Sequence, residues 1–125
     1  FFNLLGYIDI HFRPAPDFAQ ILPHYQPGNK GFAWVWWGQN GIDYATVLIE
    51  SREKNDQGIT PTERAHLIRE ELTQSLGLLQ DSWKYPDSIF YQGWTETLHY
   101  SAMDQAVIQA LYHPSIQSNM TTMDV

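Results

Sequence analysis

Apolar and polar residues alternate over residues 7–12, which is the period-two pattern of a β-strand with one buried face. Pro14 ends this pattern, because proline has no backbone N–H to donate within a sheet. We therefore expect a half-buried strand at the start of the chain. A short helical segment over residues 17–22, which Asp17 could cap, is expected to follow.

An apolar stretch lies on each side of Asn40 and Gly41, a pair that favours the type I′ turn of a β-hairpin. The two stretches cover residues 32–37 and 42–49. With Asn40 and Gly41 as the loop, large rings meet small or branched side chains across the strands. The predicted pairs are Trp36 with Ala45, Trp34 with Val47, and Phe32 with Ile49. Alternation places Trp37 on the other side, nearer solvent.

A capping box predicts a long helix that begins after Thr60. Thr60 supplies the N-cap hydroxyl, Pro61 suits the first helical position, and Glu63 stands three residues after the cap. Gly77 can adopt the positive φ that ends a helix. The residues expected to form its buried stripe are Ala65, Ile68, Leu72 and Leu76.

Ser101 and Asp104 form a second capping pattern, which predicts a C-terminal helix over residues 102–112. Its expected apolar face consists of Met103, Val107 and Leu111. Residues 78–94 show no period and predict an irregular segment, and residues 115–125 predict a mobile tail.

Together these elements predict an α+β fold with a small mixed sheet that contains the hairpin, one long helix across the sheet, and a C-terminal helix. The 125 residues fit a single domain. A sheet with only three recognisable strands leaves an exposed edge at the first strand, from Tyr7 to Phe12.

The composition excludes several classes of function. The chain has 14 acidic and 7 basic residues, with a net charge of -7 and no basic cluster, which argues against binding to nucleic acid. It has no cysteine, which excludes disulfides, thiolate zinc sites and cysteine nucleophiles. No apolar run approaches the roughly 20 residues that span a bilayer.

The long predicted helix carries two adjacent acids, Glu70 and Glu71. The polar residues around them are His66 one turn before, Gln74 one turn after, and Gln80 beyond the helix. Side chains four residues apart share one helix face, so this face could hold a metal ion or a general base. From spacing alone, a solvated face on which Arg64 and Arg69 pair with the acids is the simpler interpretation.

The order of residues 70–80 resembles the HExxHxxGxxH motif of the metzincin zinc peptidases. Glu71 stands at the general-base position and Gly77 at the sharp turn. The positions of the three zinc-binding histidines hold Glu70, Gln74 and Gln80. Residues 88–91 look like the Met-turn of that family, with phenylalanine in place of methionine. The resemblance implies a zincin-like fold with residues 32–37 as the substrate-side edge strand.

Residues 66–78 and 85–92 resemble signatures of an uncharacterised bacterial family, domain of unknown function 2927. The resemblance covers most of residues 6–120 and brings no established activity. It implies an exported, extracytoplasmic protein, and an upstream strand and helix that this chain does not contain. The chain would then be the C-terminal part of a larger domain, with the missing segment or a partner chain on the strand from Tyr7 to Phe12.

The substituted ligand set predicts weak zinc binding, because zinc prefers imidazole and thiolate and an amide oxygen is a poor ligand. A catalytic zinc must also lower the pKa of its water before Glu71 can take a proton. We therefore expect no cofactor and no standard peptide hydrolysis. Two alternatives stay open: His66 or His99 could complete a non-standard zinc site, or the oxygen-rich cluster could hold calcium or magnesium.

The leading hypothesis is a degenerate metzincin-like domain that binds an extended peptide or protein at its edge strand without cleaving it. The expected binding residues are Ala33, Trp34, Val35, Trp36, Trp37 and Tyr91, although packing in the core would also explain the rings. The first alternative is a metal-dependent peptidase with Glu71 as general base. The second is a structural subunit of a larger exported assembly.

Overall fold

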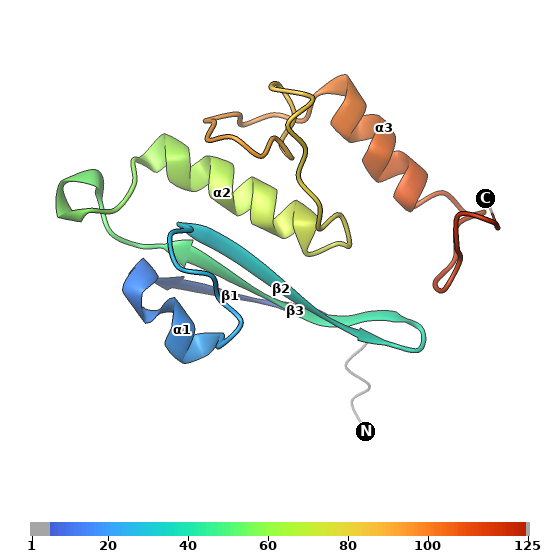
Figure 1. The fold of residues 1–125 in the computed structure, drawn as a ribbon, viewed down its shortest axis with the longest axis horizontal. Helices are drawn as coiled ribbons and strands as arrows, with labels where there is room; N and C mark the ends of the chain where they lie inside the picture. The colour runs from blue at the N-terminus through green and yellow to red at the C-terminus, as the bar shows by residue number, and fades with distance from the viewer. Residues whose placement is uncertain (1–5, 125) are drawn as a thin grey trace.

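The computed structural model describes residues 6–124; residues 1–5 and 125, which the predicted domain includes, lie outside the described residues. A three-stranded sheet in the order β1-β3-β2 forms the centre of the fold (Figure 1). The strands are β1 (Tyr7–Arg13), β2 (Gly31–Gly38) and β3 (Gly41–Glu50). β1 runs parallel to β3 and β2 runs antiparallel to it, so the predicted α+β fold with a mixed sheet is confirmed.

Helices lie on both faces of the sheet (Figure 1). They are α1 (Phe18–Ile21), α2 (Pro61–Gln74) and α3 (Ala102–Leu111), with 3-10 turns η1 (Ala15–Asp17) and η2 (Lys54–Asp56). α2 crosses one face of the sheet, and α1 covers the other. The segment between α2 and α3 holds no regular element beyond an isolated bridge, as predicted, and passes over the side of α2 away from the sheet.

Two hydrophobic clusters, one on each face of the sheet, hold the layers together. On the α1 face, Phe18 packs with Leu48. On the α2 face, Leu67 packs with Val47 and Ile49. Because successive side chains of a strand point to opposite faces, β3 supplies both clusters with alternate residues.

The hairpin is confirmed, but its register differs from the predicted one. Gly38 pairs with Gly41, so the loop residues are Gln39 and Asn40. Asn40 lacks the positive φ that a type I′ turn requires, whereas Gly41 has a φ of 122°. The observed pairs are Trp36 with Tyr44, Val35 with Ala45, Trp34 with Thr46, and Phe32 with Leu48. This register keeps the rings on the α1 face and puts the small residues of β2 beneath α2.

β1 forms an edge of the sheet, as predicted, but it is not half-buried. Ile8 and Phe12 are 38% and 51% exposed. They pair with Ala45 and Ile49, which places them on the α2 face. α2 packs against β2 and β3, so the apolar side of β1 stays open within the described part of the chain.

Both predicted capping boxes are present. The Oγ1 of Thr60 accepts a hydrogen bond from the N–H of Glu63 at 3.1 Å, and Glu63 Oε2 accepts one from the N–H of Thr60 at 2.7 Å. Ser101 and Asp104 make the same two bonds at 3.1 and 2.9 Å. Side chains that satisfy free N–H groups therefore fix the start of α2 and of α3.

The predicted buried stripes of these two helices are right only in part: Ile68 and Leu72 of α2 pack against the cluster on the sheet, whereas other members are exposed. The residues expected in them that are exposed are Ala65, Leu76, Met103 and Val107. Leu67 is the buried apolar residue that α2 places on the sheet, and Asp104 is the buried residue of α3. The irregular segment passes over a second side of α2 (Figure 1). His66 and Thr73 of α2 contact Thr97 and Tyr100 of this segment and are buried, although periodicity did not place them in the core.

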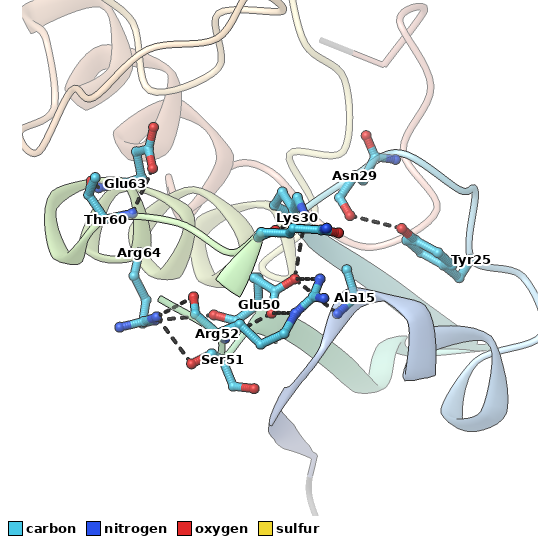
Figure 2. A network of polar contacts seen from close by, with 11 residues as sticks. Ala15, Tyr25, Asn29, Lys30, Glu50, Ser51, Arg52, Thr60, Glu63 and Arg64 are labelled. Atoms are coloured by element: carbon cyan, nitrogen blue, oxygen red, sulfur yellow. Dashed lines mark hydrogen bonds and ion pairs between the residues drawn. The ribbon is translucent and has the colours of Figure 1, made fainter. Parts of the chain in front are cut away.

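A polar network joins the end of β3 to neighbouring segments (Figure 2). The Glu50 carboxylate is 0% exposed and accepts hydrogen bonds from Arg52 Nη2 at 2.7 Å and from the N–H of Ala15 at 3.1 Å. Lys30 Nζ lies 3.5 Å from the same carboxylate. Burial acts to raise the pKa of Glu50, but the hydrogen bonds from Arg52 and Ala15 outweigh it and lower the pKa to about 2.

The C-terminal segment contacts the hairpin turn. Ser118 Oγ donates to the carbonyl of Asn40 at 2.9 Å, and Asn119 Nδ2 donates to the carbonyl of Gln39 at 2.7 Å. The mobility of this tail stays a prediction. Over residues 6–124, no helix combines the length and the apolar character that crossing a bilayer demands.

Candidate functional site

A cleft of about 440 Å³ lies where β2, α2 and the irregular segment meet. β2 contributes its first residues, α2 its C-terminal half, and the loop before β2 and the irregular segment form the other walls. The charged and amide residues that line it are Gln26, Asn29, Lys30, Glu70, Glu71, Gln74, Asp81 and Gln92. Its aromatic residues are Phe32, Tyr91 and Trp94. The cleft therefore gathers the predicted acidic helix face and one end of the predicted edge strand.

Glu71 lines the cleft with a buried side chain. It is 6% exposed, and its Oε2 has no hydrogen-bond partner within residues 6–124. A Cβ placed on Gly31 would lie 2.8 Å from Glu71 Oε1, so the missing side chain of Gly31 makes room for the carboxyl group. Burial raises the pKa of Glu71 well above its usual value, and the charges of Glu70 and Asp81 raise it further. These effects favour the uncharged, protonated acid.

Glu70 is engaged with His66, one helical turn earlier. His66 Nε2 lies 3.2 Å from Glu70 Oε2, and His66 Nδ1 lies 2.6 Å from the carbonyl oxygen of Thr97. Burial acts to lower the pKa of His66, but these two acceptors outweigh it and the pKa is raised. Both ring nitrogens face acceptor oxygens, so the protonated imidazole is favoured and a metal ion would have to displace one of these partners.

Gln74 is engaged with Asp81, a residue that the motif comparison missed. Gln74 Nε2 donates to Asp81 Oδ1 at 2.8 Å. Burial and the charge of Glu70 raise the pKa of Asp81 to about 6, against the opposing effect of the hydrogen bond from Gln74. The spacing of the metzincin motif pointed to Gln80, and only the presence of an acid at the next position could have indicated Asp81.

The predicted metal-ligand positions do not converge. Gln80 is exposed and lies outside the cleft lining, and His99 is exposed as well. Over residues 6–124, no group of three His, Asp or Glu side chains is arranged to hold a metal ion. Zinc would need imidazole donors here, and His66 is committed to its two acceptors, so the residues present do not fit a catalytic zinc.

The predicted binding residues separate into distinct places. Ala33 and Tyr91 line the cleft. Trp34 and Trp36 lie on the opposite face of the sheet, where they pack against the α1 cluster. Val35 is buried, and Trp37 is 61% exposed at the far end of β2. Trp37 borders a second hollow of about 740 Å³ between the hairpin turn and the end of α3.

A family model described as "Protein of unknown function (DUF2927)" matches residues 19–125, which is most of the chain. Comparison with curated proteins and with solved structures gave no match. None of these comparisons supports the predicted resemblance to the metzincins.

Proposed function

We propose that the chain, which belongs to the DUF2927 family of proteins of unknown function, is a binding module for an extended peptide or protein segment. It would bind this segment without cleaving it. The ligand would lie along the free edge of β2 and enter the cleft beside Glu71. This arrangement is the one expected of a degenerate metzincin-like domain.

The observation that carries this proposal is the place of β2 in the sheet. In the described part of the chain, β2 (Gly31–Gly38) pairs only with β3, so its outer edge offers unpaired backbone N–H and C=O groups. The cleft opens at this strand, at residues 31–33. A peptide that adds a strand to such an edge gains main-chain hydrogen bonds, and a neighbouring pocket can select its side chains.

Two features of the cleft argue against hydrolysis through Glu71. Glu70 and Gln74 line the cleft but Gln80 lies outside it, so the three zinc-ligand positions do not form the site that activates a water in the metzincins. The raised pKa of Glu71 also favours the protonated acid, which cannot act as a general base.

A panel of extended peptides tests the proposal. Fluorescently labelled peptides selected from a random display library would be measured by anisotropy, beside copies methylated on alternate backbone nitrogens. Strand pairing at one edge predicts that methylation of one set of nitrogens abolishes binding, whereas methylation of the other set leaves it nearly unchanged. Equal binding by both methylated forms would contradict an edge-strand mode.

The same peptides serve to test the alternative of a metal-dependent peptidase. We expect them to remain intact after long incubation with added zinc or calcium, as followed by mass spectrometry. Cleavage that disappears in Glu71→Gln would establish the peptidase and overturn the non-hydrolytic assignment.

A second candidate function, a structural role in a larger exported assembly, is favoured by the apolar side of β1. Ile8, Ile10 and Phe12 are 38%, 39% and 51% exposed at an edge strand. An upstream segment or a partner chain that adds a strand to β1 would cover them. This role predicts self-association of the isolated chain, and a strict monomer that binds no apolar dye would contradict it.

A further inference from the structure

We propose that the cleft selects a lysine or arginine side chain of the bound segment, with the unpartnered Oε2 of Glu71 as its acceptor. Glu70 and Asp81 complete an acidic pocket around Glu71, and these three residues define the pocket named here. The inference rests on the proposed function, because a strand paired to β2 must present the side chain.

The sheet register determines which ligand side chains reach this pocket. Gly31 pairs with Ile49 and Ala33 pairs with Val47, and Val47 and Ile49 belong to the cluster beneath α2. A strand added to the edge of β2 would lie about 4.8 Å away, with every second side chain on the α2 face. These side chains would project into the cleft, since Gly31 and Ala33 leave little bulk in the way.

The charges in the cleft favour a cation. Its carboxyl groups are those of Glu70, Glu71 and Asp81. Burial and the charge of Glu70 raise the pKa values of Glu71 and Asp81, and Asp81 raises that of Glu71 further. Within residues 6–124, only Glu70 of the three acids has a basic partner, His66. Lys30 is the one basic residue in the described lining, and its Nζ is engaged with the carbonyl of Gln57 at 2.9 Å and with Glu50.

A buried acceptor without a partner is unfavourable, and a ligand that supplies a donor removes that cost. Glu71 Oε2 is such an acceptor, beside a cleft that a ligand can enter. Ammonium and guanidinium groups carry only donors, and their charge favours the ionised form of Glu71, so they match its carboxylate oxygens, whereas an acidic side chain would be repelled. A divalent metal ion fits less well, because it needs several convergent oxygen ligands and the described residues offer no such group.

The test uses host peptides Thr-Val-Xaa-Val-Thr in which Xaa is lysine, arginine, norleucine or glutamate. Anisotropy would measure each against the wild-type chain and the variants Glu71→Gln and Asp81→Asn. N-butylguanidinium, followed by NMR titration, probes the acidic pocket without strand pairing. Glu53→Gln is the matched control, because it removes one negative charge from an exposed position outside the cleft lining.

We expect lysine and arginine to bind about tenfold more tightly than norleucine. This ratio should fall to about twofold or less in Glu71→Gln, decrease partly in Asp81→Asn, and stay unchanged in Glu53→Gln. Peptides that bind with no preference for a basic residue would overturn the inference and leave the proposed function standing. Glu71-dependent binding of butylguanidinium without any peptide binding would overturn the strand-pairing function and keep the cation site. If neither probe binds, both proposals are wrong.

Discussion

Glu50 and Glu71 are both buried carboxyl groups on the two sides of one small domain, and their surroundings differ in every respect. Glu50 is surrounded by the Arg52 guanidinium, the N–H of Ala15 and the Lys30 ammonium, and its pKa is lowered to about 2. Glu71 has an oxygen without a partner and carboxyl neighbours, and its pKa is raised.

The difference separates a buried acid that hydrogen-bond donors stabilise from one that lacks such donors among the described residues. Burial disfavours the charged form of both groups, and only Glu50 has the donors that reverse this effect. A folding protein gains stability from Glu50, whereas it retains Glu71 at a cost to stability. A buried acid that lowers stability and lines a cleft is typical of functional sites.

The largest expected effect is the loss of stability in Glu50→Gln. Removal of one charge from this buried group breaks its ion pairs, and we expect the free energy of unfolding to fall by about 3 kcal/mol at pH 7. Urea denaturation followed by tryptophan fluorescence would measure it. Glu53→Gln, which breaks an exposed ion pair with Arg64, should change stability by less than about 0.5 kcal/mol.

The stability difference between wild type and Glu50→Gln should disappear at low pH. The stabilisation from Glu50 is fully present above its usual pKa of 4.5 and is lost as the pH falls through its folded pKa of about 2. The stability difference between wild type and Glu50→Gln should therefore shrink as the pH falls below 4.5 and vanish below about pH 2. A difference that stays constant down to that pH would contradict the assigned role of Glu50.

At Glu71 we expect a substitution to raise stability rather than lower it. Glu71→Met keeps the length of the side chain and removes its polar atoms, so the variant should be more stable than wild type by about 2 kcal/mol at pH 8. The pKa of Glu71 is raised on folding, so its penalty is absent below pH 4.5 and grows as the pH rises. Thermal unfolding between pH 4 and pH 8 would show the gain, and a loss of stability at pH 8 would contradict it.

A smaller effect is expected where β2 approaches Glu71. The Cβ of Gly31→Ala would lie 2.8 Å from Glu71 Oε1 and 3.0 Å from Leu67 Cδ2, and we expect a loss of about 1–2 kcal/mol. A double-mutant cycle with Glu71→Ala measures the coupling. The loss should shrink in the Glu71→Ala background, and strict additivity would show that the two residues do not meet.

The smallest effect concerns Asp81. Its pKa of about 6 lies above the usual value of 3.8, so its ionisation lowers the stability of the fold as the pH rises from about 3.8 to about 6, and the penalty is constant above that. Asp81→Asn can still accept the hydrogen bond from Gln74, and it should gain about 0.5 kcal/mol over wild type between pH 4 and pH 7. Urea midpoints at the two pH values would check this.

The elements of the fold could be predicted from the sequence where local chemistry decides them. The capping boxes at Thr60 and Ser101 fix helix starts through contacts within four residues, and both were predicted. The hairpin was predicted as well, but its register was not. The turn lies at Gln39 and Asn40, one residue before the predicted type I′ turn, and an irregularity in the pairing between Trp36 and Trp37 then shifts the register by one residue. Turn chemistry alone does not reveal such an irregularity.

The candidate site was predictable only in part, because burial there depends on segments distant in sequence. The acids at positions 70 and 71 were found from a motif, and the structure places both in a cleft. The burial of Glu71 follows from Gly31 and from the irregular segment, which no period reveals. Asp81 joins the site through its bond to Gln74, a contact that depends on the turn at Gly77.

Asp104 has a consequence for how the C-terminal third of the domain folds. The same carboxylate that caps α3 also accepts hydrogen bonds from the N–H of Ile89 and from Ser88 Oγ. The helix start and the ordering of the coil before it thus depend on one side chain. If α3 or the coil around Ser88 and Ile89 formed alone, hydrogen-bond donors would lack their acceptor. We therefore expect α3 and this coil to unfold and refold together as one cooperative unit.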